Sequence, residues 1–268
     1  MSVGRGAKLG GGSIIIAVIA LLLFGGDPTD LLELLGGETA EPPVSQPPST
    51  TGAPTDEAAD FVSVVLASTE DVWGEVFAEG GYQYPEPQLV LFRDAVESAC
   101  GLSSSATGPF YCPADQQVYL DLGFLNELQR LGAAGDFAFA YVVAHEVGHH
   151  IQTITGLSDQ VRQLQARSGR MDANALSVLQ ELQADCYAGM WARQANERER
   201  ILEPGDLEEG LRAAASIGDD RLQRMSGRAV QPEAFTHGSS EQRVQWFRTG
   251  YERGSMEDCD TFAAAGVG

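Results

Sequence analysis

The chain has 268 residues, of which 43% are hydrophobic, a composition typical of a globular protein. Its formal net charge of −21 argues against a nucleic-acid partner, because phosphate contacts need clustered lysine and arginine. Roughly 200 residues follow position 58, enough to bury one sizeable core without help from disulfides.

The N-terminus has the pattern of a membrane anchor. Residues 9–26 carry no charge and have a strongly apolar middle, and as a helix they would span about 27 Å. Arg5 and Lys8 precede the stretch, whereas Asp27 and Asp30 follow it. The positive-inside rule then places residues 1–8 in the cytoplasm and the rest of the chain outside. A cleaved signal peptide is the alternative, but no small-x-small cleavage site is evident, so we expect an uncleaved single-pass anchor in a bacterial cell membrane.

A linker is expected at residues 27–58. Five prolines lie between positions 36 and 58, among serine, threonine, glycine and acidic residues. Such a segment buries too little apolar surface to fold by itself, so it predicts an extracytoplasmic tether. The folded domain is therefore expected at residues 59–268.

The pattern of this domain predicts an α+β fold, mainly helical with a small antiparallel sheet. Apolar residues at helical spacing indicate a first helix over about 61–77, closed by Gly80 and Gly81. Short strands are predicted at 88–92 and 117–122, separated by a Gly/Ser/Pro-rich stretch at 98–113. Further helices are predicted at about 124–131, 137–153, 175–198, 206–226 and 239–253.

An H-E-x-x-H motif lies within the helix predicted at 137–153. Positions i and i+4 of a helix share a face, so the His145 and His149 imidazoles can bind one tetrahedral zinc ion. Glu146 points to the side of that pair, where a carboxylate acts as general base rather than as ligand. The motif also occurs by chance, so by itself it indicates only a candidate site.

A second pair of carboxylates follows on the helix predicted at 175–198. Catalytic zinc usually has three protein ligands, and Glu181 completes the set with His145 and His149. Asp185, one turn later, is predicted to accept the second ring N–H of a ligating histidine. The alternative, a solvated acidic face, fits poorly with the apolar residues of this helix. This order resembles that of gluzincin-type peptidases, which implies a zincin-like fold, and E-x-x-A-D resembles membrane-associated heat-shock and prenyl-protein zinc peptidases.

Three further residues are considered near this motif. His150 is rotated about 100° from His149 on a helix, which indicates a structural or surface role. His237 precedes a predicted helix and either stabilises an oxyanion or is a hydrogen-bonded loop histidine. Arg243 either serves similarly or holds a carboxylate in place. The strand at 118–121 is the candidate edge for binding a peptide substrate as an added strand.

The chain contains four cysteines, Cys100, Cys112, Cys186 and Cys259. Outside the cytoplasm an even number suggests two disulfides, and four cysteines permit three pairings. One pairing joins Cys100 to Cys112 through a local loop, which leaves Cys186 to tie the Glu181 helix to Cys259 near the C-terminus. No C-x-x-C spacing indicates a cysteine zinc site.

Many short stretches between about residues 61 and 262 resemble one bacterial family, the "putative neutral zinc metallopeptidases". The stretches that carry the resemblance are 71–73, 98–101, 108–113, 118–121, 135–138, 145–150, 181–186, 217–221, 235–238 and 259–262. The resemblance implies an N-terminal anchor, one zinc ion per chain and peptidase-type active-site residues, without a known substrate. It meets no departure at His145, Glu146, His149 or Glu181.

The sequence thus predicts a membrane-anchored zinc endopeptidase that acts on proteins or peptides. One alternative is a non-catalytic, zinc-binding interaction module, which an intact Glu146 disfavours because a purely structural site has no use for it. Another is a hydrolase of peptidoglycan peptide stems, for which no dedicated cell-wall-binding segment is evident.

Overall fold

The structure is a computed structural model that describes residues 57–104, 108–133 and 135–267. The predicted anchor at 9–26 and nearly all of the linker lie outside these residues. Within the described part of the chain, none of the helices combines the length and the apolar character that crossing a membrane requires.

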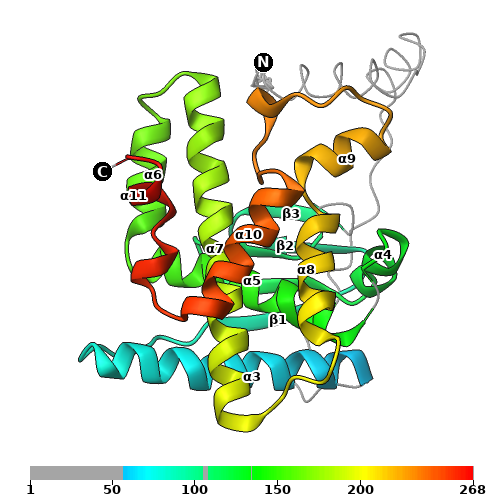
Figure 1. The fold of residues 1–268 in the computed structure, drawn as a ribbon, viewed down its shortest axis with the longest axis vertical. Coiled ribbons are helices and arrows are strands. Elements are labelled where there is room, and N and C mark those ends of the chain that lie inside the picture. Colours follow the sequence, from blue (N-terminus) through cyan, green and yellow to red (C-terminus); the bar gives the residue numbers. More distant parts are fainter. Residues whose placement is uncertain (1–56, 105–107, 134, 268) are drawn as a thin grey trace, which may run out of the picture. The chain divides into compact units, whose positions relative to one another are not determined.

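The first helix, α3 (Glu57–Glu79), confirms the helix predicted at 61–77 and extends it at both ends. Val62, Val72 and Trp73 are buried, so one stripe of α3 faces the core. The chain then turns at Gly81, which has a φ of +78°. Figure 1 shows α3 crossing the end of a long helix, α7 (Arg170–Glu199), and both α3 and α7 contact the helix that carries the H-E-x-x-H motif.

The main sheet has three strands in the order β1-β5-β4, with bounds Gln88–Phe92, Gln117–Asp121 and Phe110–Cys112 respectively. β5 is parallel to β1 and antiparallel to β4, so the expectation of a purely antiparallel sheet is wrong. β2 (Ala95–Ser98) and β3 (Gly101–Ser104) form a separate antiparallel pair. β3 and β4 both lie within the stretch at 98–113 that the sequence left without strands.

The expectation that residues 118–121 form a sheet edge is also wrong. β5 lies in the centre of the sheet, and its Val118 and Leu120 are fully buried. A strand with neighbours on both sides has paired its backbone N–H and C=O groups and cannot accept a further strand. Among the described residues, β1 and β4 are the edges of this sheet.

The remaining chain is helical. The predicted helices are confirmed except that 206–226 is two helices, which break at Gly218. A Cβ at Gly218 would lie 2.4 Å from the backbone nitrogen of Ser240, so only glycine allows this close approach. A short helix lies between the helix that carries His145 and His149 and the helix that carries Glu181, and it was not predicted. The bounds are α4 Phe124–Arg130, α5 Asp136–Ile154, α6 Leu157–Gln165, α8 Asp206–Ser216, α9 Asp219–Met225, α10 Ser240–Arg253 and α11 Thr261–Ala264, with single 3₁₀ turns η2 Pro232–Ala234 and η3 Glu257–Cys259.

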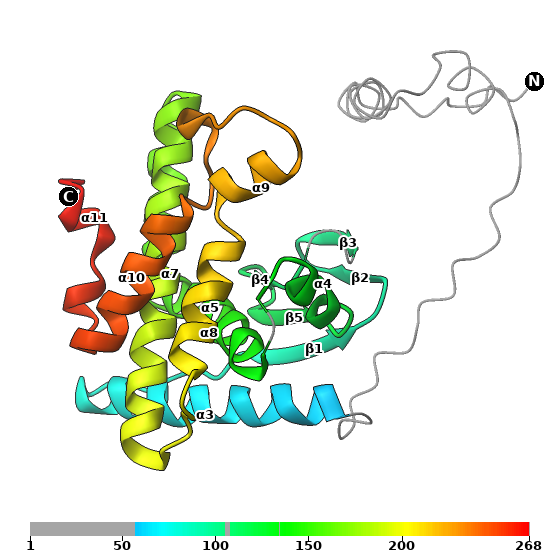
Figure 2. The same cartoon turned by 45° about the vertical axis from the view of Figure 1, so that its right-hand side comes forward.

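Helix α5 forms the centre of the core. Nearly all of its residues from Phe137 to Gln152 are buried, because α3, α7, α8 and the sheet all pack on it. Figures 1 and 2 show α10 lying beside α7 and α8, and it contacts both. Its backbone reaches α7 closely, since a Cβ at Gly189 would lie 2.0 Å from the Phe247 carbonyl oxygen. Helices α5, α7 and α10 therefore form one tightly packed group.

Two disulfides are present, Cys100–Cys112 and Cys186–Cys259. The first joins the turn between β2 and β3 to β4. The second joins α7, one residue after Asp185, to the 3₁₀ turn η3. This is the pairing suggested by the local Cys100–Cys112 loop.

Candidate metal centre

Helices α5 and α7 bring together the three residues that the sequence proposes as metal ligands. His145 Nε2 lies 3.3 Å from one carboxylate oxygen of Glu181, and His149 Nε2 lies 3.4 Å from the other. One donor atom from each of the three residues lies within 4.8 Å of the other two. His145 is buried, whereas His149 and Glu181 are partly exposed, so the group is open on one side.

The spacing of these atoms fits a tetrahedral zinc ion. Zinc binds histidine nitrogen and carboxylate oxygen at roughly 2.0–2.1 Å, so two ligand atoms at tetrahedral positions lie about 3.3–3.4 Å apart. The two separations from a histidine nitrogen to its nearer Glu181 oxygen have this length. Two histidines with one carboxylate are also a donor set that zinc accepts, with a fourth position left for water or substrate.

A close contact between α5 and α7 makes this geometry possible. A Cβ at Gly148 would lie 3.0 Å from the Cα and 3.1 Å from the carbonyl oxygen of Ala184. Gly148 lies one residue before His149, and Ala184 lies one residue before Asp185. The two small residues therefore allow the histidine helix and the glutamate helix to approach at the level of the metal donors.

A buried ionic network supports His145. Its Nδ1–H donates to Asp185 Oδ1 at 2.9 Å, and Asp185 is completely buried. The Tyr141 hydroxyl donates a hydrogen bond to the same oxygen. Arg243 Nε and Nη2 donate to the two oxygens of Asp185, each at 2.9 Å. Of the two sequence interpretations of Arg243, the structure favours the one in which it holds a carboxylate.

A neutral network supports His149. Its Nδ1–H donates to Gln152 Oε1 at 2.9 Å, and Gln152 is fully buried. Gln152 Nε2 donates to the Gln180 carbonyl oxygen at 2.7 Å and to Gln183 Oε1 at 3.1 Å. These two acceptors fix the amide orientation, so its oxygen must face the histidine. Each histidine therefore has Nδ1 engaged as a donor and Nε2 directed towards Glu181.

Sequence reasoning missed Gln152, Gln183 and Tyr141. The available signal was weak: a glutamine three residues after His149 interrupts an otherwise apolar helix face, and a tyrosine lies one turn before His145. Buried polar groups of this kind require partners, which a sequence alone does not identify.

The charges around the group favour an ionised carboxylate at Glu181. Burial by itself raises the pKa of Glu181, but the neighbouring His149 and His145 outweigh it and hold the pKa well below its usual range. Burial lowers the pKa of His145, but the Asp185 charge and the hydrogen bonds that His145 donates to Asp185 and Glu181 raise it to about 10. A cation at the Nε2 atoms would take the place of that proton.

Glu146 follows His145 in α5 and is 7% exposed. It lies between the two candidate ligand histidines in the sequence of this helix and is not one of the three residues whose donor atoms form the group. A general base must lie within hydrogen-bond reach of the attacking water, and a carboxylate beside the first histidine of this motif is the candidate for that role.

His237 lies in the loop before α10 and is held there by Asp219. Asp219 Oδ2 accepts the backbone N–H groups of Thr236, His237 and Gly238, at 2.7, 2.7 and 3.1 Å. Its other oxygen lies 3.3 Å from His237 Nδ1. The hydrogen bond to Asp219 raises the pKa of His237 above its ordinary value, and the negative charge of Glu181 acts in the same direction. The imidazole of His237 is half exposed.

His150 faces away from the donor group. It is fully buried, its Nε2–H donates to the Pro85 carbonyl oxygen at 2.6 Å, and its Nδ1 accepts from the Tyr111 hydroxyl at 3.1 Å. Burial lowers the pKa of His150, so it is neutral at physiological pH. The structure thus gives it a structural role, joining α5 to β4 and to the segment before β1.

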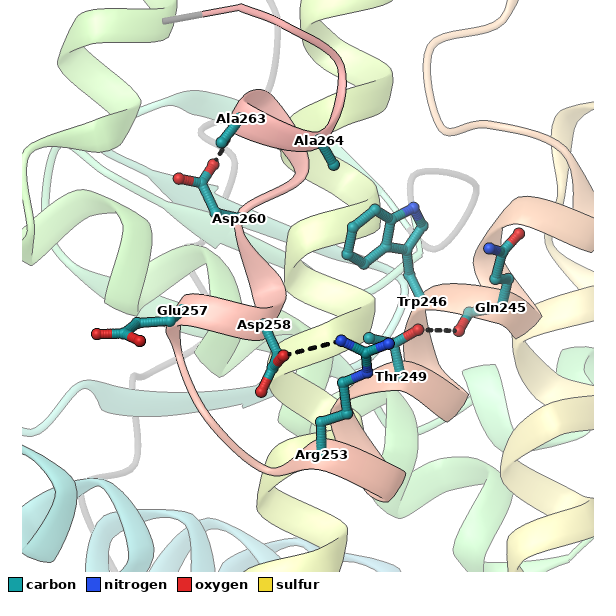
Figure 3. Close-up of a pocket in the computed structure, with 9 residues that line it drawn as sticks. All are labelled: Gln245, Trp246, Thr249, Arg253, Glu257, Asp258, Asp260, Ala263 and Ala264. Carbon is teal, nitrogen blue, oxygen red and sulfur yellow. Dashed lines mark hydrogen bonds and ion pairs between the residues drawn. The ribbon is translucent and has the colours of Figure 1, made fainter.

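Two other features of the described residues are weaker candidates. The carboxylates of Asp136, Asp206 and Glu209 also lie close together, but they are partly exposed and offer only oxygen donors. A pocket of about 600 Å³ lies on the outer side of α10, around Trp246 (Figure 3). It contains none of the proposed ligands, and its Asp258 already pairs with Arg253 at 3.1 Å.

Comparison with known proteins gives the same assignment as the site. A family model described as "Putative neutral zinc metallopeptidase" matches residues 1–262. The protein YpfJ of Escherichia coli (strain K12) is 48% identical over 264 residues, which cover 97% of this chain and 90% of YpfJ. Rv2575 of Mycobacterium tuberculosis (strain H37Rv) is 43% identical over 196 residues, 69% of this chain and 65% of Rv2575. Both relatives are described as uncharacterized. No solved structure matches.

Proposed function

Because the chain belongs to the "putative neutral zinc metallopeptidase" family, we propose that it is a zinc-dependent endopeptidase that hydrolyses peptide bonds in proteins or peptides. The observation that carries the proposal is the cluster of His145, His149 and Glu181 donor atoms, with nitrogen–oxygen separations of 3.3 and 3.4 Å, beside a buried glutamate that is not in the cluster. A purely structural zinc site would use all four positions for protein ligands and would leave no open side.

In this proposal the three donors hold one zinc ion per chain. Zinc, when bound, supplies a Lewis acid that polarises the scissile carbonyl and acidifies water. Glu146 takes the proton from the attacking water and returns it to the nitrogen of the leaving amine. His237, held by Asp219, donates a hydrogen bond to the oxyanion of the tetrahedral intermediate. Gln152 and Asp185 keep the two histidines in the tautomer that presents Nε2 to the metal.

The sheet edge nearest to the metal helix is β4. It contacts α5 and pairs only with β5 among the described strands. An extended peptide bound along β4 would place its backbone beside α5, and its main-chain hydrogen bonds would tolerate varied sequences. We therefore transfer the proposed substrate edge from 118–121 to Phe110–Cys112.

The proposed location is the outer face of a bacterial cytoplasmic membrane. Residues 9–26 would be the single anchor, and 27–58 the tether. The two disulfides support an oxidising compartment, since structural disulfides are rare in the reducing cytoplasm.

The test uses the full-length chain in detergent, with zinc analysis and a peptide-library cleavage assay. We expect one zinc ion per chain and cleavage that Glu146→Gln reduces by about 10²–10⁴-fold without loss of zinc, because only proton transfer is removed. Glu127→Gln, an exposed glutamate paired with Arg130, is the matched control and should leave cleavage unchanged.

The peptidase proposal would be refuted if the chain is fully occupied by zinc and no peptide is cleaved in a way that depends on Glu146. That result would favour the alternative, a membrane-anchored module that binds zinc for structure or for interaction with a partner.

A further inference from the structure

The metal donors come from α5 and α7, yet a residue of α10 reaches into the support of the site. Arg243 is 2% exposed, and its Nε and Nη2 donate to both oxygens of Asp185. Nη2 also donates to the Tyr141 hydroxyl at 3.2 Å, and Nη1 points to the Ile217 carbonyl oxygen at 3.5 Å. One guanidinium thus touches groups from α5, α7 and the loop before α9.

The guanidinium fixes the direction of the Asp185 carboxylate. A planar guanidinium with two parallel N–H groups binds a carboxylate in a single orientation, unlike the point charge of a lysine. Oδ1 of Asp185 accepts from Arg243 Nη2 and also from the Tyr141 hydroxyl and His145 Nδ1. The ring of His145 therefore has one favoured rotation, and in that rotation Nε2 faces Glu181 at 3.3 Å.

Helix α10 is itself held firmly in position. Ser239 and Gln242 form a capping box at its start, and Asp220 accepts from the backbone N–H and the hydroxyl of Ser240. The close approach of Gly250 to the Cys186 carbonyl oxygen holds its second half against α7. The backbone of α10 therefore holds Arg243 in a fixed position relative to α7.

We propose that Arg243 is a positioning residue of the metal centre, which locks Asp185 so that α5 and α7 present His145 to zinc. The site then needs three helices, although only two supply ligands. His149 has no equivalent, because its support is the neutral Gln152 amide within α5. The inference rests on the proposed zinc site but not on catalysis.

The experiment measures the zinc dissociation constant of the full-length chain by competition with a chromogenic chelator, together with the visible spectrum of the cobalt(II)-loaded chain. Arg243→Met should weaken zinc binding on the order of 10–100-fold, the usual effect of losing support behind a ligand. Arg243→Lys keeps the charge but not the two parallel N–H groups, so it should also weaken binding and alter the cobalt spectrum. Arg253→Met, a surface arginine of the same helix paired with Asp258, should match the wild type.

Two measurements separate positioning from a merely structural role. Val244→Ala removes core packing by the next residue of α10 and should lower the midpoint of thermal unfolding without changing the cobalt spectrum. Arg243→Lys should weaken zinc little further in an Asp185→Asn background, because both act through one carboxylate. Additive losses, or wild-type zinc affinity in folded Arg243→Met or Arg243→Lys, would overturn the inference. If Arg243→Met does not fold, the lysine variant decides.

These outcomes are distinguishable from failure of the proposed function. A wild-type chain that binds zinc but cleaves nothing would refute the peptidase and leave the role of Arg243 intact. An active peptidase whose zinc affinity is unchanged by substitution of Arg243 would refute the role of Arg243 and leave the proposed function intact.

Discussion

Replacing Gln152 with leucine tests the neutral support of His149. Leucine has nearly the volume of glutamine but removes the acceptor for His149 Nδ1–H and the donor to Gln183 Oε1. Gln152 is fully buried and Gln183 is 5% exposed, so water cannot replace these bonds without rearrangement. Each buried group left unsatisfied costs about 1–3 kcal/mol, with the partly exposed His149 at the low end, which gives a total of about 2–4 kcal/mol.

The same change should weaken zinc binding by about 10–100-fold, because the His149 ring loses the bond that fixes its tautomer and rotation. Thermal unfolding of the chain without added metal would report the stability loss, which corresponds to a decrease of roughly 5–15 °C in melting temperature. Chelator competition would report zinc affinity. Gln160→Leu, at an exposed position of α6, is the matched control and should change neither quantity measurably.

The reasoning would be refuted by a folded Gln152→Leu chain that binds zinc as tightly as the wild type. In that case the glutamine would only stabilise the packing of α5 on α7. A lower melting temperature with unchanged zinc affinity would lead to this conclusion even if the stability estimate is right.

Two further predictions concern Gly148 and Asp219. Gly148→Ala should destabilise the fold by about 1–3 kcal/mol and weaken zinc binding, because the added Cβ meets the Ala184 backbone at 3.0–3.1 Å. Gly74→Ala on α3 is the control: a Cβ there has nothing within 4 Å, so the change should be neutral or stabilising by up to about 1 kcal/mol. Denaturant unfolding of the two variants distinguishes these effects. Asp219→Asn should shift the alkaline limb of the kcat/KM profile to lower pH: the Asp219 hydrogen bond raises the pKa of His237, so removing the charge lowers it, and the protonated donor is lost at lower pH. An unmoved limb would exclude protonated His237 from the reaction.

The sequence predicted the helices and the donor triad because both are local patterns. The H-E-x-x-H spacing requires only helical periodicity, and the positions of α5 and α7 follow from long apolar stripes. Glu181 and Asp185 belong to one helical turn, so their shared face is also a local property. The family resemblance and the comparisons agree on this part of the chain.

Contacts between residues far apart in the chain could not be predicted from the sequence pattern. The composition of residues 117–121 does not show that they pair parallel with β1, because a buried central strand and a half-buried edge strand can have similar composition. The break at Gly218 depends on the approach of Ser240, which lies 22 positions later in the chain. The prediction that Asp185 supports a histidine is confirmed at His145, but the support of His149 was missed, since Gln152 needs Gln180 and Gln183 from another helix to fix its orientation.

The unequal support of the two histidines has an electrostatic consequence for the proposed reaction. Asp185 is ionised, since its pKa stays below the ordinary value although burial acts to raise it, with the Arg243 charge as the largest opposing cause. Arg243 cancels that charge at 2.9 Å, and the Gln152 amide adds none. Glu181 is then the only net charge that the donors and their supports bring to zinc, so the ion would keep about one unit of positive charge for a developing oxyanion. A single unpaired carboxylate behind either histidine would neutralise it. A guanidinium-paired carboxylate behind one histidine and an amide behind the other would therefore combine fixed ligands with a strong Lewis acid in the proposed enzyme.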